Sequence, residues 1–126
     1  MKIAGKAYRT IWLGEDGWSV MVIDQTRLPF SFETVRLTEV EEAAAAIRDM
    51  IVRGAPLIGA TAAYGVALAL RRDSSDAALE QALALLGATR PTAVNLAWAL
   101  ARMRARLIDL PETERVAAAY AEAAAI

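Results

Sequence analysis

Glycine and proline divide an alanine-rich sequence into segments of helical length from residue 38 onward. Hydrophobic residues make up 56% of the chain, and many of them are alanine, the residue that loses least entropy in a helix. Glycine and proline interrupt this sequence at 54–56, 87–91 and 111. The spacing therefore predicts five helices, covering about 38–53, 56–72, 76–87, 92–108 and 111–126.

The helix boundaries are predicted from local capping signals. Thr38 followed by Glu41 has the spacing of a capping box, so the first helix is expected to begin there. Gly54 is expected to end it in a left-handed cap, and Pro56 suits the first turn of the next helix. Thr92 is the expected N-cap of the fourth helix. Small residues occur all round the second helix over 59–65, which predicts a buried central helix.

The N-terminal quarter has the composition of strands. Residues 6–13 and 18–24 are rich in β-branched and aromatic side chains, and 14–17 supply a turn, which together predict a hairpin. Pro29 interrupts, and 31–37 alternates as a third short strand. The predicted fold is α+β and mainly α: one domain, with a small antiparallel sheet over 1–37 and a bundle of about five helices over 38–126.

Composition excludes several classes of function. The chain has no cysteine and no histidine, so disulfides, thiolate chemistry and the commonest metal ligand are excluded within it. Its net charge of -1 favours neither nucleic acid nor an anionic membrane. No apolar run approaches the roughly 20 residues that a bilayer requires. We expect a soluble cytoplasmic protein with no metal, no cofactor, no nucleic-acid partner and no membrane contact.

The corner Arg53-Gly54-Ala55-Pro56 has the features of an anion site. A helix N-terminus offers unpaired N–H groups, glycine lets the backbone approach an anion, and arginine adds charge. The alternative is that Arg53 compensates the dipole at a helix C-terminus and that Gly54 is only a cap.

A second arginine, Arg90, also lies just before a helix start. The two arginines could converge on one anion, with Asn95 as an additional amide donor. The alternatives are that Arg90 is a solvated loop side chain and that Asn95 is a buried, satisfied polar group.

Other charged groups have structural explanations. Arg102, Arg104 and Arg106 are two residues apart, so on a helix they fan around the axis and form no basic track. The acidic residues at 39, 41 and 42 suit the first turn of a helix, where they favour capping and the macrodipole. No catalytic residue is therefore assigned within this chain.

Three runs together resemble the N-terminal domain of the S-methyl-5-thioribose-1-phosphate isomerases, within the superfamily that includes the regulatory subunits of translation initiation factor two-B. They are Ile23-Asp24-Gln25-Thr26-Arg27-Leu28-Pro29, the stretch from Ile47 to Gly65, and Thr89-Arg90-Pro91-Thr92-Ala93-Val94-Asn95-Leu96. The resemblance spans nearly the whole chain, in the expected order.

The resemblance implies an enzyme of methionine salvage that converts an aldose 1-phosphate to the ketose 1-phosphate. Substrate would be bound by Arg53, Gly54 and Ala55, with Arg90 as a second contact. The family's catalytic cysteine and aspartate belong to a C-terminal α/β domain that is absent from this chain, and the full-length protein is expected to be a homodimer. Two alternatives stay open: an isomerase of ribose 1,5-bisphosphate or another pentose 1-phosphate, and a non-catalytic regulatory subunit.

Overall fold

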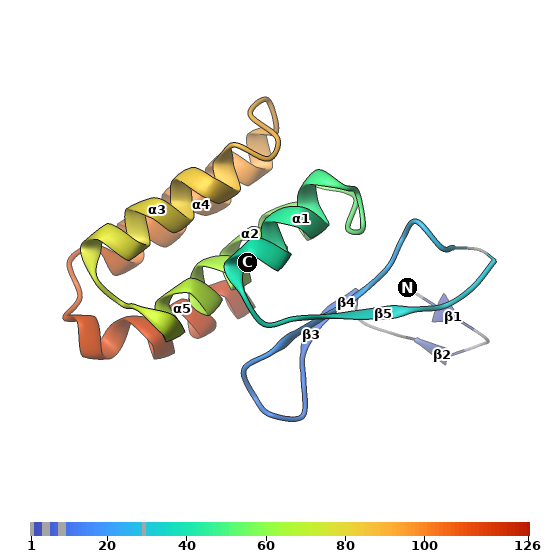
Figure 1. The fold of residues 1–126 in the computed structure, drawn as a ribbon, viewed down its shortest axis with the longest axis horizontal. Coiled ribbons are helices and arrows are strands. Elements are labelled where there is room, and N and C mark those ends of the chain that lie inside the picture. The colour runs from blue at the N-terminus through green and yellow to red at the C-terminus, as the bar shows by residue number, and fades with distance from the viewer. Residues whose placement is uncertain (1, 4–5, 8–9, 29) are drawn as a thin grey trace.

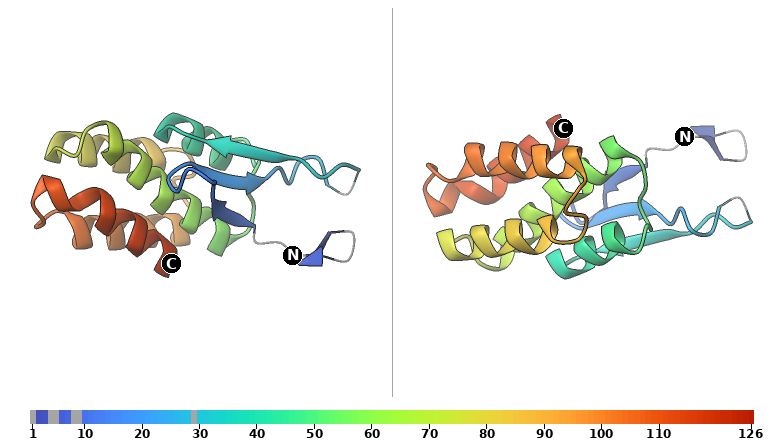
Figure 2. Two further views of the ribbon diagram at one scale, coloured as in Figure 1. Left: turned by 90° about the horizontal axis from the view of Figure 1, so that it is seen from below. Right: turned by 90° about the horizontal axis from the view of Figure 1, so that it is seen from above.

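The chain forms a small antiparallel sheet and five helices, as predicted. The computed structural model describes residues 2–3, 6–7, 10–28 and 30–126. Figures 1 and 2 show the helices grouped at one end of the molecule and the strands at the other. The strands are β1 (Lys2–Ile3), β2 (Lys6–Ala7), β3 (Ile11–Leu13), β4 (Val20–Ile23) and β5 (Thr34–Leu37). The helices are α1 (Val40–Arg48), α2 (Ala55–Arg72), α3 (Asp76–Gly87), α4 (Val94–Leu107) and α5 (Glu112–Ala125).

Strands β3, β4 and β5 pair in sequence order as one antiparallel sheet. The predicted turn joins β3 to β4, where the N–H of Gly14 donates to the carbonyl of Ser19 at 2.8 Å. The predicted first strand, 6–13, is wrong as one strand. Its first part, β2, pairs with β1 in a separate two-stranded ribbon, and its last part, β3, pairs with β4. Residues 8 and 9 of that prediction, and the predicted break at Pro29, lie outside the described residues.

Helix α1 begins and ends at different residues from those predicted. Glu39 is its N-cap, and the Glu42 carboxylate accepts the N–H of Glu39 at 3.1 Å and the N–H and hydroxyl of Thr38 at 2.9 and 2.7 Å. The bonds with Thr38 hold the pKa of Glu42 below its usual range. The capping pair is therefore Glu39 with Glu42, one residue beyond the predicted pair.

The C-terminal end of α1 is Arg48, five residues before the predicted end at Arg53. The chain turns at Met50, which has a positive φ of 62°. This turn brings Val52 back into the core, where it is fully buried and its N–H donates to the carbonyl of Ala46 at 3.2 Å. Gly54 is therefore not the cap of α1, because burial of Val52 requires the helix to end earlier.

Helix α2 is the centre of the fold, as the small residues over 59–65 predicted. It contacts all four other helices and is buried on every side from residue 61 to residue 70. A Cβ at Gly65 would lie 3.0 Å from the Cβ of Ala43 and 3.2 Å from the side chain of Leu86. A Cβ at Gly59 would lie 3.4 Å from the Cβ of Ala99. Gly65 therefore allows α1 and α3 to pack closely on α2, whereas a Cβ at Gly59 would meet α4 at ordinary contact distance.

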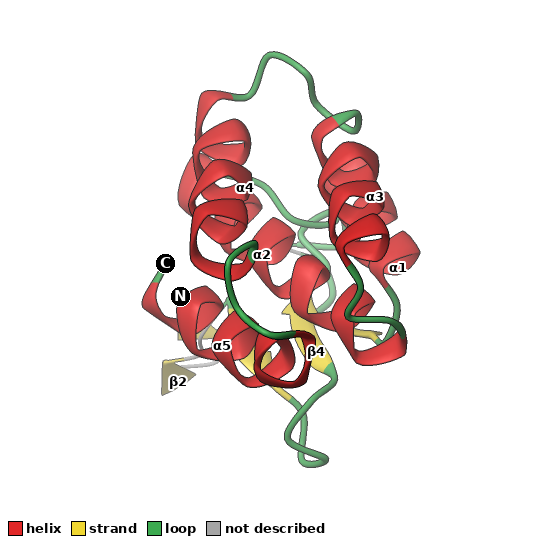
Figure 3. Cartoon of the chain, turned by 90° about the vertical axis from the view of Figure 1, so that its left-hand side faces the viewer, coloured by secondary structure: helices red, strands yellow, loops and turns green. Residues whose placement is uncertain are grey.

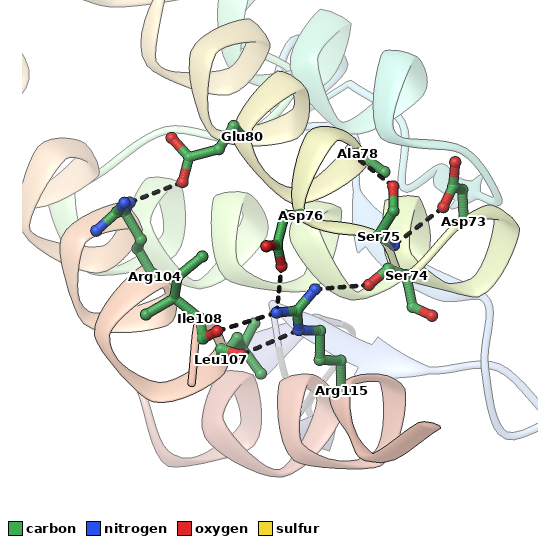
Figure 4. A network of polar contacts seen from close by, with 10 residues as sticks. All are labelled: Asp73, Ser74, Ser75, Asp76, Ala78, Glu80, Arg104, Leu107, Ile108 and Arg115. Atoms are coloured by element: carbon green, nitrogen blue, oxygen red, sulfur yellow. Dashed lines mark hydrogen bonds and ion pairs between the residues drawn. The ribbon is translucent and has the colours of Figure 1, made fainter. Parts of the chain in front are cut away.

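A buried arginine joins the last three helices. Arg115, in α5, is 3% exposed, and its guanidinium donates to the carbonyls of Leu107, Ile108 and Ser74 and to the carboxylate of Asp76 (Figure 4). It thereby caps the C-terminal end of α4 and fixes the start of α3. A loop joins α3 to α4 at the other end of these helices (Figure 3). Local sequence gave no signal for this contact.

Replacement of Arg115 is expected to destabilise the fold strongly. Arg115→Met leaves three carbonyls without this donor, so the free energy of unfolding should fall by about 2–4 kcal/mol in urea titrations. Arg104→Met is the matched control. Arg104 and Glu80 form an ion pair at 2.7 Å with both side chains about half exposed, so its loss should cost less than about 1 kcal/mol. Equal losses would contradict the special role of Arg115.

The two glycines of α2 should respond differently to alanine. Gly65→Ala places a methyl group against Ala43 and Leu86, so overpacking should lower the free energy of unfolding by about 1–3 kcal/mol. Gly59→Ala meets only ordinary contact distances, and the gain in helix propensity, up to about 1 kcal/mol, should leave stability equal or higher. Thermal unfolding of the two variants side by side checks this order, and the reverse order would refute it.

Candidate functional site

The N-termini of two helices meet at one cavity. Helix α2 begins after Gly54 and α4 begins after Ala93, and neither N-terminus is capped by a side chain. The cavity between them has a volume of about 470 Å³. It is lined by Met50, Arg53, Gly54, Ala55, Ile58, Arg90, Ala93, Val94, Asn95 and Leu96. All four predicted substrate-binding residues are on this list.

The backbone at Gly54 suits the close approach of an anion. Gly54 is the N-cap of α2 with φ 90° and ψ 135°, a conformation that residues with a Cβ rarely adopt. Its carbonyl accepts the N–H of Ile58 at 2.9 Å, which closes the first turn of the helix. Pro56 has no N–H, so the first-turn donors of α2 come from Ala55 and Leu57. The positive end of the helix dipole therefore faces the cavity.

Arg53 and Arg90 differ from the other arginines that the structure describes. The others each pair with a carboxylate, except Arg71, whose guanidinium lies 3.7 Å from the ring centroid of Trp18. Within the described ranges, the side chains of Arg53 and Arg90 have neither an ion pair nor a hydrogen bond. Two cations without a protein partner thus line one cavity, and charge complementarity favours an anion there.

The first turn of α4 is fixed against α2. The carbonyl of Asn95 would lie 3.4 Å from a Cβ at Gly59, and Leu96, next in the chain, is 1% exposed. Asn95 itself is exposed and lines the cavity, so it is not the buried polar group of the alternative prediction. The N-cap of α4 is Ala93, one residue after the predicted Thr92, because the helix starts where Leu96 enters the core.

The structure brings Arg53, Gly54, Ala55 and Arg90 to one cavity. The alternative in which Arg53 is the C-terminal cation of α1 is excluded, since α1 ends at Arg48. Arg90 is partly buried and is thus not a fully solvated loop arginine. The binding of substrate by these four residues stays a prediction.

Sequence reasoning missed the apolar side of the cavity. Met50 and Val94 line it and are 45% and 79% exposed. The sequence carries no signal for them, because both residues lie inside the predicted helices 38–53 and 92–108. In the structure Met50 follows the end of α1, and Val94 opens α4. An exposed large apolar residue at a helix end is too common to identify a site.

The other charged clusters are structural. Arg102 and Arg106 both pair with Glu122, and Arg104 pairs with Glu80, so these arginines form no basic track, as predicted. A search of the described residues for acidic, histidine or cysteine clusters suited to a metal ion finds none. In the same part of the chain, no helix is both long and apolar enough to cross a membrane.

A second cavity, of about 460 Å³, lies among α1, α2 and α3. Its lining includes two acidic residues, Glu41 and Asp73, and one basic residue, Arg72. Arg72 forms an ion pair with the Glu39 carboxylate at 3.8 Å. The second cavity therefore offers an anion no unpaired cation, and the cavity between the N-termini of α2 and α4 is the better candidate.

Known proteins are similar to this chain over its whole length. The chain is 64% identical to methylthioribose-1-phosphate isomerases of Methylorubrum extorquens and Paramagnetospirillum magneticum, over 100% of this chain and 34% and 35% of those proteins. Identity to the Escherichia coli protein of that name is 57%. The chain thus spans about a third of the length of the curated relatives that it matches.

Two solved structures share the fold. One is the crystal structure of 5-methylthioribose 1-phosphate isomerase from Pyrococcus horikoshii, with a TM-score of 0.80 and 38% identity over 93% of this chain and 36% of that one. The other is translation initiation factor eIF-2B, subunit delta, from A. fulgidus, with a TM-score of 0.83 and 36% identity over 94% of this chain and 36% of that one. A model of the Initiation factor 2 subunit family matches residues 51–125, which include the cavity residues from Arg53 to Leu96. The chain belongs to the Initiation factor 2 subunit family.

Proposed function

We propose that this chain holds the phosphate of S-methyl-5-thioribose 1-phosphate in an aldose–ketose isomerase of methionine salvage. The reaction yields the corresponding ribulose 1-phosphate. Support comes from the relatives of 57–64% identity that carry the name methylthioribose-1-phosphate isomerase. The physical support is the cavity at which two unpaired arginines and two uncapped helix N-termini meet. This convergence is the observation that carries the proposal.

In the proposed complex, Arg53 and Arg90 donate charge-assisted hydrogen bonds to the phosphate oxygens. Backbone N–H groups at Gly54 and Ala55 add donors without a side chain in the way. The glycine lets the phosphate come close to the backbone, and the dipoles of α2 and α4 add to the favourable potential. A phosphate held from several directions has a fixed orientation, so the sugar ring is held in one place for the chemical step.

Phosphate on the anomeric carbon blocks the free ring opening that an unsubstituted aldose undergoes. The enzyme must therefore assist ring opening and then move hydrogen between adjacent carbons. No carboxylate lines the cavity among the described residues, and the sequence has no cysteine or histidine. We infer that the groups that transfer the proton lie outside these 126 residues. The family resemblance implies that they are a cysteine and an aspartate of a C-terminal α/β domain.

The remaining features of the proposal concern the full-length protein. We propose that residues 1–126 are its N-terminal domain, with the sheet over 1–37 and the helices over 38–126. The full-length protein acts as a homodimer in the cytoplasm, without a nucleic-acid partner. Light scattering of the full-length protein tests the dimer, and a monomer at micromolar concentration would contradict it.

Two other functions are consistent with a phosphate site. An isomerase of ribose 1,5-bisphosphate would use the same phosphate contacts, since these do not identify the rest of the sugar. The likeness to the structure of translation initiation factor eIF-2B, subunit delta, favours a regulatory subunit. Turnover of each sugar by the full-length protein distinguishes the three, because a regulatory subunit converts neither.

Removal of a cavity arginine is expected to impair the full-length enzyme. Arg53→Ala and Arg90→Ala each remove a charge-assisted bond to phosphate, so kcat/KM should fall about 100-fold. Arg102→Ala is the matched control, since Arg102 pairs with Glu122 in α5 and does not line the cavity. Steady-state kinetics of the three variants test the assignment. Near wild-type values for Arg53→Ala and Arg90→Ala would refute it.

The 126-residue chain alone is expected to fold and to lack isomerase activity. It contains the helical core and the proposed phosphate contacts but none of the proposed proton-transfer groups. Circular dichroism should show a cooperative helical transition, while an assay for ketose 1-phosphate should show no product. Turnover by the purified chain would overturn the division of the site between this chain and the rest of the protein.

A further inference from the structure

The cavity between the N-termini of α2 and α4 is lined by two unlike kinds of group. Its lining combines the cations Arg53 and Arg90 and the two helix N-termini with the apolar side chains of Met50, Ile58 and Val94. Ile58 is part of the core, whereas Met50 and Val94 are 45% and 79% exposed. Burial in this fold therefore does not account for the apolar character of Met50 and Val94.

The backbone at Met50 makes its side chain unusual. Asp49 is the C-cap of α1, so Met50 occupies the next position, where glycine is strongly preferred because φ is positive. Met50 has a φ of 62°, and its N–H donates to the carbonyl of Ile47 at a long 3.4 Å. A side chain in the left-handed region is strained, and such strain is concentrated at functional sites. A methionine where glycine would be less strained points to a use for its side chain.

Val94 is placed firmly although it is exposed. It is the first residue of α4, and the next two residues are fixed by the contact of Asn95 with Gly59 and by the burial of Leu96. The isopropyl group is β-branched and stiff at χ1, so it presents one fixed apolar surface to the cavity. Met50 is flexible and polarizable, and adapts to the shape of an apolar group placed against it.

We propose that Met50 and Val94 form the specificity wall for the sugar, which takes an apolar substituent at the end of the pentose remote from the phosphate. This inference rests on the proposed function. A thioether group placed against the wall loses contact with water at no electrostatic cost. In the proposed complex Arg53 and Arg90 bind the first phosphate, so a second phosphate at Met50 and Val94 would lose its hydration without an arginine to pair with. The wall thus favours a methylthio sugar over a hydroxyl or phosphate at the same carbon.

The test uses the full-length protein and two sugars that differ only at the remote carbon: S-methyl-5-thioribose 1-phosphate and ribose 1-phosphate. Met50→Gln and Val94→Thr keep the size of each side chain and make it polar. In the double variant, the ratio of kcat/KM for the methylthio sugar to that for ribose 1-phosphate should fall about tenfold, the usual effect of a lost apolar contact. The ratio of dissociation constants from calorimetry should change in the same direction.

Leu85→Gln is the matched control. Leu85 is 40% exposed, similar to Met50, but it lies in α3 and lines the second cavity. Its substitution should leave both ratios within about twofold of wild type, as expected for a site without contact to the sugar. Thermal unfolding of all variants checks that each is folded at the assay temperature.

The outcomes separate this inference from the proposed function. An unchanged preference in the double variant, with activity retained, overturns the specificity wall and leaves the isomerase standing. A second outcome is that the wild-type protein binds the methylthio sugar selectively without turning it over, and that the double variant loses this selectivity. That outcome refutes the isomerase and supports the specificity wall. Absence of binding of either sugar by the wild-type protein overturns both.

Discussion

Close packing around α2 is the constraint on which the rest of the structure depends. A helix buried on all sides needs neighbours at short distance, and Gly65 allows this because a Cβ there would press on α1 and α3. The contact at Gly59 lies one turn from the N-terminus of α2 and meets Asn95 in the first turn of α4. The same packing that builds the core therefore brings two helix N-termini to one cavity.

That cavity shows how a small helical domain concentrates positive potential without a high net charge. The chain as a whole has a formal charge of -1, and most of its arginines are paired with carboxylates. Two arginines have no ion pair within the part of the chain that the structure describes, and they lie where two helix dipoles point. Local placement, rather than composition, makes the site attractive to an anion.

The contrast between Arg115 and Arg53 shows two uses of the same side chain. Arg115 is 3% exposed, and its donors are satisfied by three carbonyls and Asp76, so it holds α3, α4 and α5 together. Arg53 is exposed beside a helix start, with no protein partner among the described residues. An arginine whose donors are already satisfied stabilises a fold, whereas one with free donors is available to a ligand.

The sequence by itself determined the sheet followed by five helices and the central position of α2, because composition, glycine and proline act locally along the chain. The four candidate residues came from the arginines beside two helix starts and from the family resemblance, and their binding of substrate stays a prediction. It misjudged the end of α1 and the first strand, and gave no signal for Arg115. Only the tertiary structure decided that Val52 returns to the core and that Met50 and Val94 share a cavity with Arg53 and Arg90. These features depend on contacts between segments distant in sequence, which local propensity does not contain.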